Sequence, residues 1–339
     1  MAIPVLAALM STYNSAAYLR ATIDSVLSQS FTDFEFVIVD DGSTDDTVSI
    51  INSYQDSRIR LFCRSENKGV GFSLQEAILH VTAPYVIKVD SDDLSHFDRF
   101  AIQLNYLQEN PDVAVVKCYI DAFAESDDPE TVERLNTRQR DYSAANQINT
   151  VSLIRQHLPR WLCVEHTSYC ARTDAIKAVG YPEQRLCEDY SLFYRLNELG
   201  FRIGCVPEYL VKVRVNKQSV TADVNTERLL SWFTYVFELK ERRIMQLVGD
   251  APGISIYGSG GLARLMYRIL NKHGVQVLNF IEQNSKAAVV IDGVEIPVKG
   301  LSDCLQQKIL IAAQPVRLEM VRQLTELGLN EWRDFMVIA

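Results

Sequence analysis

The sequence has no Cys-x-x-Cys pair, no excess of basic residues and no long apolar run. Its seven cysteines are scattered along the chain, which favours reduced thiols in a cytoplasmic protein over a disulfide framework. There are 34 basic and 43 acidic side chains, giving a formal net charge of -9. This balance excludes sequence-independent binding to nucleic acid, which depends on basic contacts to phosphates.

Targeting and membrane-spanning segments are also missing. The first ten residues are apolar but lack a basic region, and polar residues follow at 11–14, so they predict a buried strand and not a signal peptide. No apolar stretch approaches the roughly 20 residues that a bilayer-spanning helix needs. The chain is therefore expected to be cytoplasmic, with a membrane contacted at most peripherally.

What is present is an alternation of apolar runs and amphipathic patterns over the first hundred residues, typical of an α/β fold. Strands are predicted at 3–10, 34–39, 58–63 and 85–89, and helices at 16–28, 46–54 and up to about residue 80. A polar cluster follows each of these strands. Ligands of open α/β sheets bind beyond the carboxyl ends of the strands, so this edge is the expected site.

The rest of the chain gives coarser predictions. Residues 124–149 are polar and predict an exposed helix or loop, residues 188–199 a helix, residues 202–206 a strand, and residues 226–248 one long amphipathic helix. Gly249 to Gly253 breaks that helix and is the best domain boundary. The expected division is a catalytic domain at 1–220, a linking helix at 221–250 and a small domain at 251–339.

Asp90 and Asp92 follow an apolar strand and are two residues apart. Such a pair can bind one Mg²⁺ or Mn²⁺ ion together with a ribose or diphosphate, because these cations prefer oxygen ligands. An acidic turn that begins the next helix would have the same sequence. Asp40, with a carboxylate able to accept hydrogen bonds from a nucleoside, and the turn from Asn67 to Gly69 stand at two other strand ends.

In combination, these residues resemble the inverting family 2 glycosyltransferases, which have a GT-A fold. The resemblance covers residues 3 to about 220 and rests on five motifs in the expected order: Ser11-Thr12-Tyr13-Asn14, Asp40-Asp41-Gly42-Ser43, Asn67-Lys68-Gly69, Asp90-Ser91-Asp92-Asp93 and Glu188-Asp189. Ser11 replaces the proline that is more usual in that place.

The resemblance implies a role for each motif. The nucleotide and donor would be bound by Thr12, Tyr13, Asn14, Asp40, Asn67, Lys68, Asp90 and Asp92, with Lys68 near the diphosphate. Asp92 would ligate the metal, and Asp90 the metal or the ribose. Asp189 would be the general base, and the negative charge of Glu188 beside it would raise its pKa. Without the other motifs, these two acids would be explained by the helix dipole alone.

Two places weaken or complicate this assignment. Asn216 stands where many relatives carry a histidine that ligates the metal, while the neighbouring Lys217 could offset diphosphate charge. Trp161 and His166 lie where relatives build the acceptor side, although both residue types are more often part of a core. Cys163, His166 and Cys170 lack a clear fourth ligand for zinc.

The small C-terminal unit carries its own motif. Gly258 and Gly260 follow a predicted strand and open a predicted helix, and Glu282 ends the next strand, where an acid binds ribose hydroxyls. The unit looks like a small Rossmann-like domain. Two interpretations remain open: a degenerate fold kept for packing or dimerisation, and a second nucleotide site.

The sequence thus predicts a metal-dependent transferase that moves a sugar, most simply from a UDP-sugar, to a glycan or lipid-linked acceptor in surface polysaccharide synthesis. One alternative is a non-catalytic, GT-A-like scaffold that binds nucleotide-sugars. A second is an oxidoreductase using the motif at Gly258, which leaves the acidic clusters unexplained. The apolar face of residues 226–248 is also compatible with a homo-oligomer.

Overall fold

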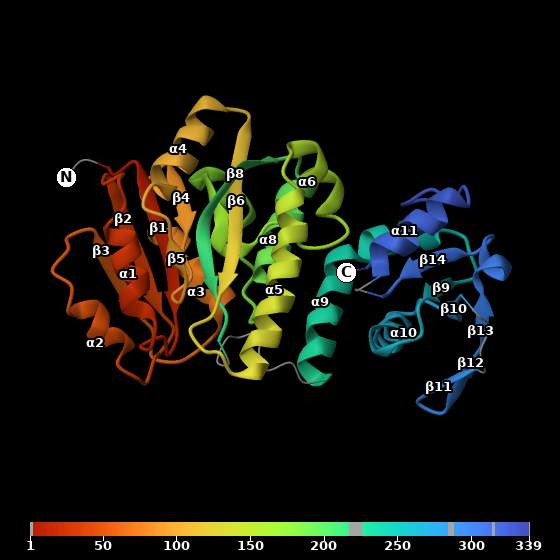
Figure 1. The fold of residues 1–339 in the computed structure, drawn as a ribbon. Coiled ribbons are helices and arrows are strands. Elements are labelled where there is room, and N and C mark those ends of the chain that lie inside the picture. Colours follow the sequence, from red (N-terminus) through yellow and green to blue (C-terminus); the bar gives the residue numbers. More distant parts are fainter. Residues whose placement is uncertain (1–2, 217–225, 284–287, 314–315, 339) are drawn as a thin grey trace. The chain divides into compact units, whose positions relative to one another are not determined.

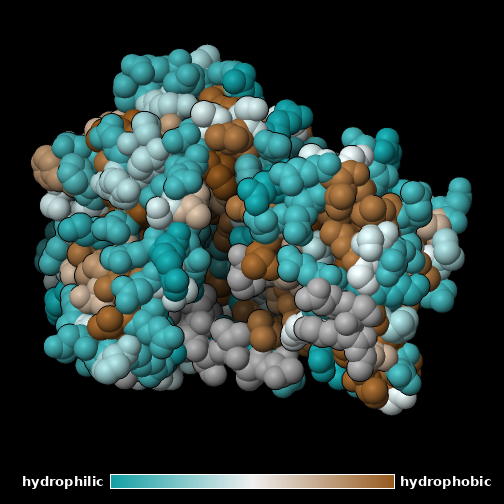
Figure 2. Space-filling view, turned by 45° about the vertical axis from the view of Figure 1, so that its right-hand side comes forward, coloured by the Kyte–Doolittle hydropathy of each residue, from teal (hydrophilic) through white to brown (hydrophobic). Residues whose placement is uncertain are grey.

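The computed structural model describes residues 3–216, 226–283, 288–313 and 316–338. It divides into two compact units, Met1–Asp223 and Val224–Ala339. Each unit contains its own sheet flanked by helices (Figure 1). The face visible in Figure 2 is mostly hydrophilic, with hydrophobic residues in small groups.

The N-terminal unit is built on an eight-stranded sheet with the order β3-β2-β1-β4-β7-β6-β8-β5. Its strands are β1 (Leu6–Thr12), β2 (Phe34–Asp40), β3 (Ile59–Cys63), β4 (Tyr85–Lys88), β5 (Leu94–Ser95), β6 (Val113–Phe123), β7 (Tyr169–Arg172) and β8 (Arg202–Arg214). Strands β1 to β4 run parallel, β7 is antiparallel to both of its neighbours, and β6 and β8 are parallel to each other. The mixed α/β sheet agrees with the fold class predicted from the sequence.

The helices of this unit are α1 (Leu19–Leu27), α2 (Thr47–Asn52), α3 (Val70–His80), α4 (Arg99–Glu109), α5 (Pro129–Gln147), α6 (Val151–His157), α7 (Thr173–Val179) and α8 (Glu188–Glu198), with a 3-10 turn, η1, at His166–Ser168. The apolar sides of β1 and β2 are fully buried and pack against α1 and α4 residues in one hydrophobic core. Burial on both faces is what the near-continuous apolar runs of these strands indicate.

Two segments differ from the sequence prediction. The strand predicted at 202–206 continues to Arg214, because Pro207 and Glu208 bulge out of the pairing between β6 and β8 and the ladder resumes at Tyr209. A proline is tolerated within a strand at such a bulge. The polar segment at 124–149 forms α5, which Asp128 caps by accepting a hydrogen bond from the Thr131 amide.

The C-terminal unit contains a five-stranded parallel sheet. Its strands are β9 (Ile254–Tyr257), β10 (Val277–Glu282), β13 (Val298–Gly300), β14 (Lys308–Ile311) and β15 (Phe335–Val337), and their order is β13-β10-β9-β14-β15. The first strand is central, two later strands lie on one side and two on the other, which is the doubly wound order of Rossmann-type sheets. The unit also holds α9 (Thr226–Val248), α10 (Gly261–Lys272), α11 (Arg317–Glu326), the 3-10 turn η2 (Leu301–Cys304) and the hairpin of β11 (Val289–Ile291) and β12 (Val294–Ile296).

Helix α9 belongs to the C-terminal unit, which begins at Val224, whereas the sequence predicts a separate linking helix at 221–250. The Phe237 ring lies 4.5 Å from the His273 ring, and the buried Lys240 ammonium donates to the Ile338 carbonyl. The apolar face of α9 is therefore used, at least in part, within its own unit.

No disulfide joins any of the seven cysteines. Within the described ranges, no helix has both the length and the apolar composition that a bilayer crossing requires.

Candidate functional site

The carboxyl ends of β1, β2 and β4 meet at one edge of the N-terminal sheet. Thr12 pairs with Asp40 in the strand register, and its hydroxyl donates to the Asp40 carboxylate at 3.3 Å. On the other side, the loops after β1 and β4 touch through the hydroxyls of Ser15 and Ser91, 2.8 Å apart. The fold thus brings three of the sequence motifs together.

The loop after β2 is folded by bonds among the motif residues themselves. The buried Asp40 carboxylate accepts from the Ser43 amide at 2.9 Å and from the Ser43 hydroxyl at 2.5 Å. Asn14 adopts a left-handed conformation (φ 48°), and its side-chain oxygen accepts from the Thr44 amide at 2.9 Å. The Tyr13 ring remains 47% exposed, which leaves it accessible to a ligand.

Asp41 was not among the site residues predicted from the sequence, yet it has a structural role in the site. It is buried, and its carboxylate accepts from the backbone amides of Lys68 (3.1 Å) and Gly69 (2.7 Å). The Arg64 guanidinium lies 3.5 Å from the same carboxylate. Asp41 therefore fixes the turn at 67–69 against the end of β2. Two adjacent aspartates, Asp40 and Asp41, at a strand end are a sequence signal for one carboxylate that faces the ligand and one that holds the loop.

The turn itself faces a second loop. Asn67 accepts two hydrogen bonds from Arg185, at 2.9 Å on its side-chain oxygen and 2.5 Å on its carbonyl. Lys68, expected near the diphosphate, is exposed, and its ammonium lies 3.5 Å from the Glu66 carboxylate. The side-chain oxygen of Asn67 is thus already engaged within the protein.

Asp90 lies beside a buried lysine. The Lys88 ammonium is fully buried, forms an ion pair with Asp90 and donates to the Val89 carbonyl at 2.9 Å. Burial alone would raise the pKa of Asp90, but Lys88 and other positive charges outweigh it and hold the pKa below its usual value. The negative charge of Asp90 is therefore balanced by the neighbouring Lys88 ammonium.

Asp92 has a different environment. Burial, with the negative charge of Asp90, raises the pKa of Asp92 to about 6. The Asn216 side-chain amide donates to Asp92 at 3.3 Å, so Asn216 lies beside Asp92 and presents an N–H group to it. Lys217 lies outside the described residues. Asp93 is buried and accepts from the Arg214 amide at 3.0 Å, which ties β8 to this loop.

These residues suit a divalent cation that takes few protein ligands. Asp90 and Asp92 supply two hard oxygen donors, and burial with the charge of Asp90 disfavours the ionised form of Asp92, a cost that a bound cation would offset. No group of three or more His, Cys, Asp or Glu side chains is arranged to hold a metal in the parts of the chain that the structure describes. Mg²⁺ commonly binds through one or two carboxylates and substrate phosphates, so the pair fits that mode. The zinc arrangement considered for Cys163, His166 and Cys170 is not formed.

Glu188 and Asp189 occupy the first turn of α8, directly after Cys187 in a left-handed conformation (φ 66°). Burial, with the charge of Asp189, raises the pKa of Glu188 to about 8. The pKa of Asp189 is raised to about 6, mainly by burial and also by Asp90. The direction agrees with the sequence prediction, but its main cause is burial and not the neighbouring Glu188.

The segment before β7 completes the surroundings of this acid pair. His166 is buried, its Nδ1 lies 3.6 Å from the Glu188 carboxylate, and its Nε2 has no hydrogen-bond partner among the described residues. Burial, with the charge of Lys88, lowers the pKa of His166 to about 3, so the ring is neutral. Burial, with Asp189, raises the pKa of Glu165 to about 7. Trp161 is buried beside His157, with ring centres 4.9 Å apart, and does not offer an open stacking face.

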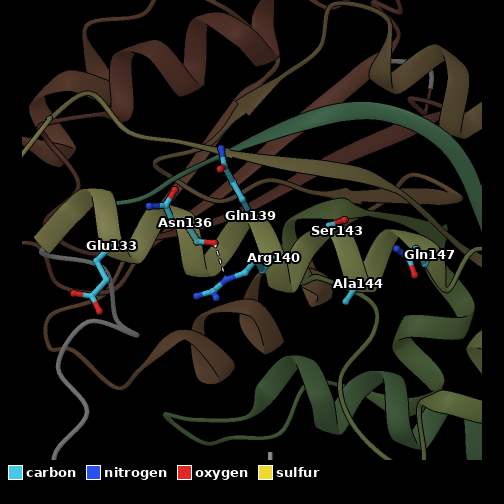
Figure 3. A pocket seen from close by; sticks show the side chains of 7 residues that line it. All are labelled: Glu133, Asn136, Gln139, Arg140, Ser143, Ala144 and Gln147. Carbon is cyan, nitrogen blue, oxygen red and sulfur yellow. Dashed lines mark hydrogen bonds between the residues drawn. The ribbon is translucent and has the colours of Figure 1, made fainter. Parts of the chain in front are cut away.

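A separate pocket lies on the polar face of α5 (Figure 3). Its lining residues all come from that helix: Glu133, Asn136, Gln139, Arg140, Ser143, Ala144 and Gln147. Arg140 donates to the Asn136 carbonyl at 3.3 Å, shown as the dashed line. None of the motif residues lines this pocket.

In the C-terminal unit, the glycine motif stands between β9 and α10. Gly258 has a positive φ of 106°, whereas a side chain added at Gly260 would meet no atom within 4 Å. The Ser259 hydroxyl donates to Glu282 at the end of β10. The three residues singled out from the sequence are therefore neighbours at the carboxyl edge of this sheet.

Residues 8–162 match the family model described as glycosyl transferase family 2. The chain carries a family 2 glycosyltransferase domain. It is 29% identical over 188 residues to an uncharacterized glycosyltransferase of Haemophilus influenzae, covering 53% of this chain and 74% of that one. It is 35% identical over 108 residues to the putative teichuronic acid biosynthesis glycosyltransferase TuaG of Bacillus subtilis, covering 31% and 43%.

A further relative, the bifunctional glycosyltransferase pgtA of Dictyostelium discoideum, is 38% identical over 117 residues. That match spans 33% of this chain and only 15% of the relative. Among solved structures, S. aureus TarS with UDP-GlcNAc superposes with a TM-score of 0.54 at 18% identity, covering 79% of this chain and 72% of TarS. The mannosyltransferase PcManGT of Pyrobaculum calidifontis, with GDP-Man and Mn²⁺, gives 0.52 at 18%, covering 80% and 70%. These likenesses show the GT-A fold.

Proposed function

We propose that this glycosyltransferase inverts the anomeric carbon of a nucleotide-sugar donor, most simply a UDP-sugar, and transfers the sugar to a hydroxyl of a glycan or lipid-linked acceptor. One observation carries the proposal. The acidic loop after β4 and the acid pair that begins α8 lie in one electrostatic environment, since the charge of Asp90 contributes to the raised pKa of Glu188 and of Asp189.

The donor would bind along the strand ends. Thr12, Tyr13, Asn14 and Asp40 lie at the ends of β1 and β2, and the turn at 67–69 closes this side through Asp41. Asp92 and Asp90 would hold Mg²⁺ or Mn²⁺, which would offset negative charge on the departing diphosphate. The Mn²⁺ in the PcManGT complex and the UDP-GlcNAc in the TarS complex support this choice of ligands.

The reaction is a single displacement. Asp189 accepts the proton of the acceptor hydroxyl, whose oxygen forms a bond to the anomeric carbon while the bond from that carbon to the diphosphate breaks. Glu188, protonated below about pH 8, and neutral His166 beside it would orient the acceptor. TuaG, named for teichuronic acid biosynthesis, supports a role in surface polysaccharide synthesis.

The test is calorimetric titration of UDP, GDP, dTDP and NAD, each with Mn²⁺ and with EDTA. Wild type should bind one nucleoside diphosphate only with metal, Asp92→Ala should abolish that binding, and Asp98→Ala should leave it intact. Asp98 is a suitable control because it begins α4 without a side-chain capping bond. Binding without turnover of any donor would favour a non-catalytic scaffold, and no diphosphate binding would refute both.

A second candidate site concerns the C-terminal unit alone. We propose that its glycine motif binds a nucleotide, with Gly258 and Gly260 against the phosphates and Glu282 on a ribose. The open space at Gly260, at the start of α10, supports this assignment. NAD or nucleotide-sugar binding that survives Asp92→Ala but is lost in Glu282→Ala would establish the site. Absence of such binding leaves packing or self-association as its role.

A further inference from the structure

Two loops far apart in sequence are held together beside the acid pair. Arg185, in the loop before α8, donates to the side-chain oxygen of Asn67 at 2.9 Å and to its carbonyl at 2.5 Å. Asn67 begins the turn that follows β3 on the nucleotide side. The Arg185 guanidinium thus donates to both acceptor groups of Asn67, and this two-point contact fixes the orientation of the two loops as well as their distance.

Glycines make this approach possible. A side-chain carbon added at Gly69 would lie 2.7 Å from the Arg185 side chain, and one added at Gly71 would overlap the Pro182 carbonyl oxygen. The same loop is fastened to α3, because the Gln75 side chain accepts from the Tyr181 amide at 2.8 Å. The loop therefore packs on the start of α3 with no space between them.

The two loops differ in what else holds them. The second anchor of the turn at 67–69 acts on the turn itself, since the buried Asp41 accepts from two of its amides, whereas the other anchor of the loop is at Tyr181, four residues before Arg185. The loop ends at Cys187, whose left-handed conformation leads directly into Glu188 and Asp189. Loss of the Arg185 contact should therefore release the acid pair more than the turn.

We propose that Arg185 is a positioning residue that couples the nucleotide-side turn at 67–69 to the acid pair Glu188 and Asp189. The inference rests on the proposed function for its catalytic consequence. The physical coupling of the two loops stands on geometry alone. Arg185 is exposed, so its hydrogen bonds contribute little to folding stability, and its removal should act on the site.

Hydrogen exchange of the free protein tests the coupling without any ligand. In Arg185→Ala, the amides of residues 186–191 should exchange about tenfold faster, whereas those of residues 67–73 should change little because Asp41 still holds them. The control is Arg202→Ala, which removes an exposed arginine paired with Asp112 at the opposite edge of the sheet. Unchanged exchange at 186–191 in Arg185→Ala would overturn the inference.

Kinetics with the donor found by calorimetry test the consequence. Arg185→Ala should lower kcat for donor turnover about tenfold and change the donor KM less, since the base moves and the turn does not. In an Asn67→Ala background, adding Arg185→Ala should lower kcat less than it does in wild type, because Asn67→Ala already removes the side-chain half of the contact and leaves only the bond to the backbone carbonyl. Full additivity, or wild-type kcat in Arg185→Ala, would overturn the proposal. A wild type without any donor turnover would instead refute the proposed function, and the exchange result would still decide the coupling.

Discussion

Replacing Asp189 with asparagine separates catalysis from helix stability. Asp189 Oδ1 accepts a hydrogen bond from the Tyr190 amide at 2.6 Å, which an asparagine oxygen can also accept. The substitution therefore keeps the shape and the local bond and removes the negative charge together with the ability to take a proton. A first-turn acid also favours the helix dipole, an effect of about 0.3–1 kcal/mol.

The two roles predict effects of very different size. Loss of a general base should lower kcat by about 10²- to 10⁴-fold, whereas the dipole contribution is a small change in stability. Wild-type kcat/KM should also fall as pH falls through about 6, because the base must be ionised and its pKa is raised to about 6. At one pH unit below the pKa, roughly one tenth of the base is ionised.

The assay is donor turnover across pH 4.5–9 for wild type, Asp189→Asn and Asp174→Asn. Asp174 is the matched control, since it is in the first turn of α7 and accepts from the Ala175 amide at 2.8 Å in the same way. Asp174→Asn should keep wild-type kcat. If Asp189→Asn lost no more than about threefold in kcat, with its acid limb unchanged, Asp189 would not be the base. Because Glu188 and Asp189 are adjacent acids, the limb reports an apparent value of the pair.

Three further predictions follow from neighbouring features. Asp41→Asn should raise the donor KM about tenfold in steady-state kinetics, because one backbone amide of the turn after β3 loses its carboxylate acceptor. The Glu188 carboxyl has a pKa of about 8 in the folded protein and 4.5 in the unfolded chain, so the free energy of unfolding should fall as pH rises between these values. In urea melts with EDTA, Glu188→Gln should therefore be more stable than wild type at pH 8 and similar to it at pH 5. Gly258→Ala should lower the Tm, because φ at Gly258 is 106° and the added carbon would lie 3.3 Å from a backbone oxygen. Gly260→Ala should leave the Tm unchanged and weaken only nucleotide binding at that motif.

Several features were predictable from local sequence. The strands β1 and β2 read as apolar runs because their side chains are buried on both faces, and the polar clusters after the strands of this sheet mark the strand ends. The periodicity of residues 226–248 predicts α9 with its observed bounds. These signals lie within one helix or strand, so no distant contact is needed to detect them.

Other features depend on residues far apart in the chain. Ser43 and Thr44 precede α2 without capping it, because the Ser43 hydroxyl donates to Asp40 and the Thr44 hydroxyl donates to Asn14. A capping residue and a loop-closing residue have the same short polar side chain, and only the return of β1 beside β2 decides between them. The strand β8 continues past Pro207 because β6 is available to resume pairing.

The sequence alone determined the fold class, the strand-end acids and the order of the motifs, because these are written in local patterns of polarity. Only the tertiary structure decided which charges meet. It placed the buried Lys88 beside Asp90 and the negative charge of Asp90 beside Asp92; it assigned Asp41 to the turn and Arg185 to Asn67. Burial and charge proximity set the pKa values of a site, and both are properties of packing between segments that lie up to 124 residues apart.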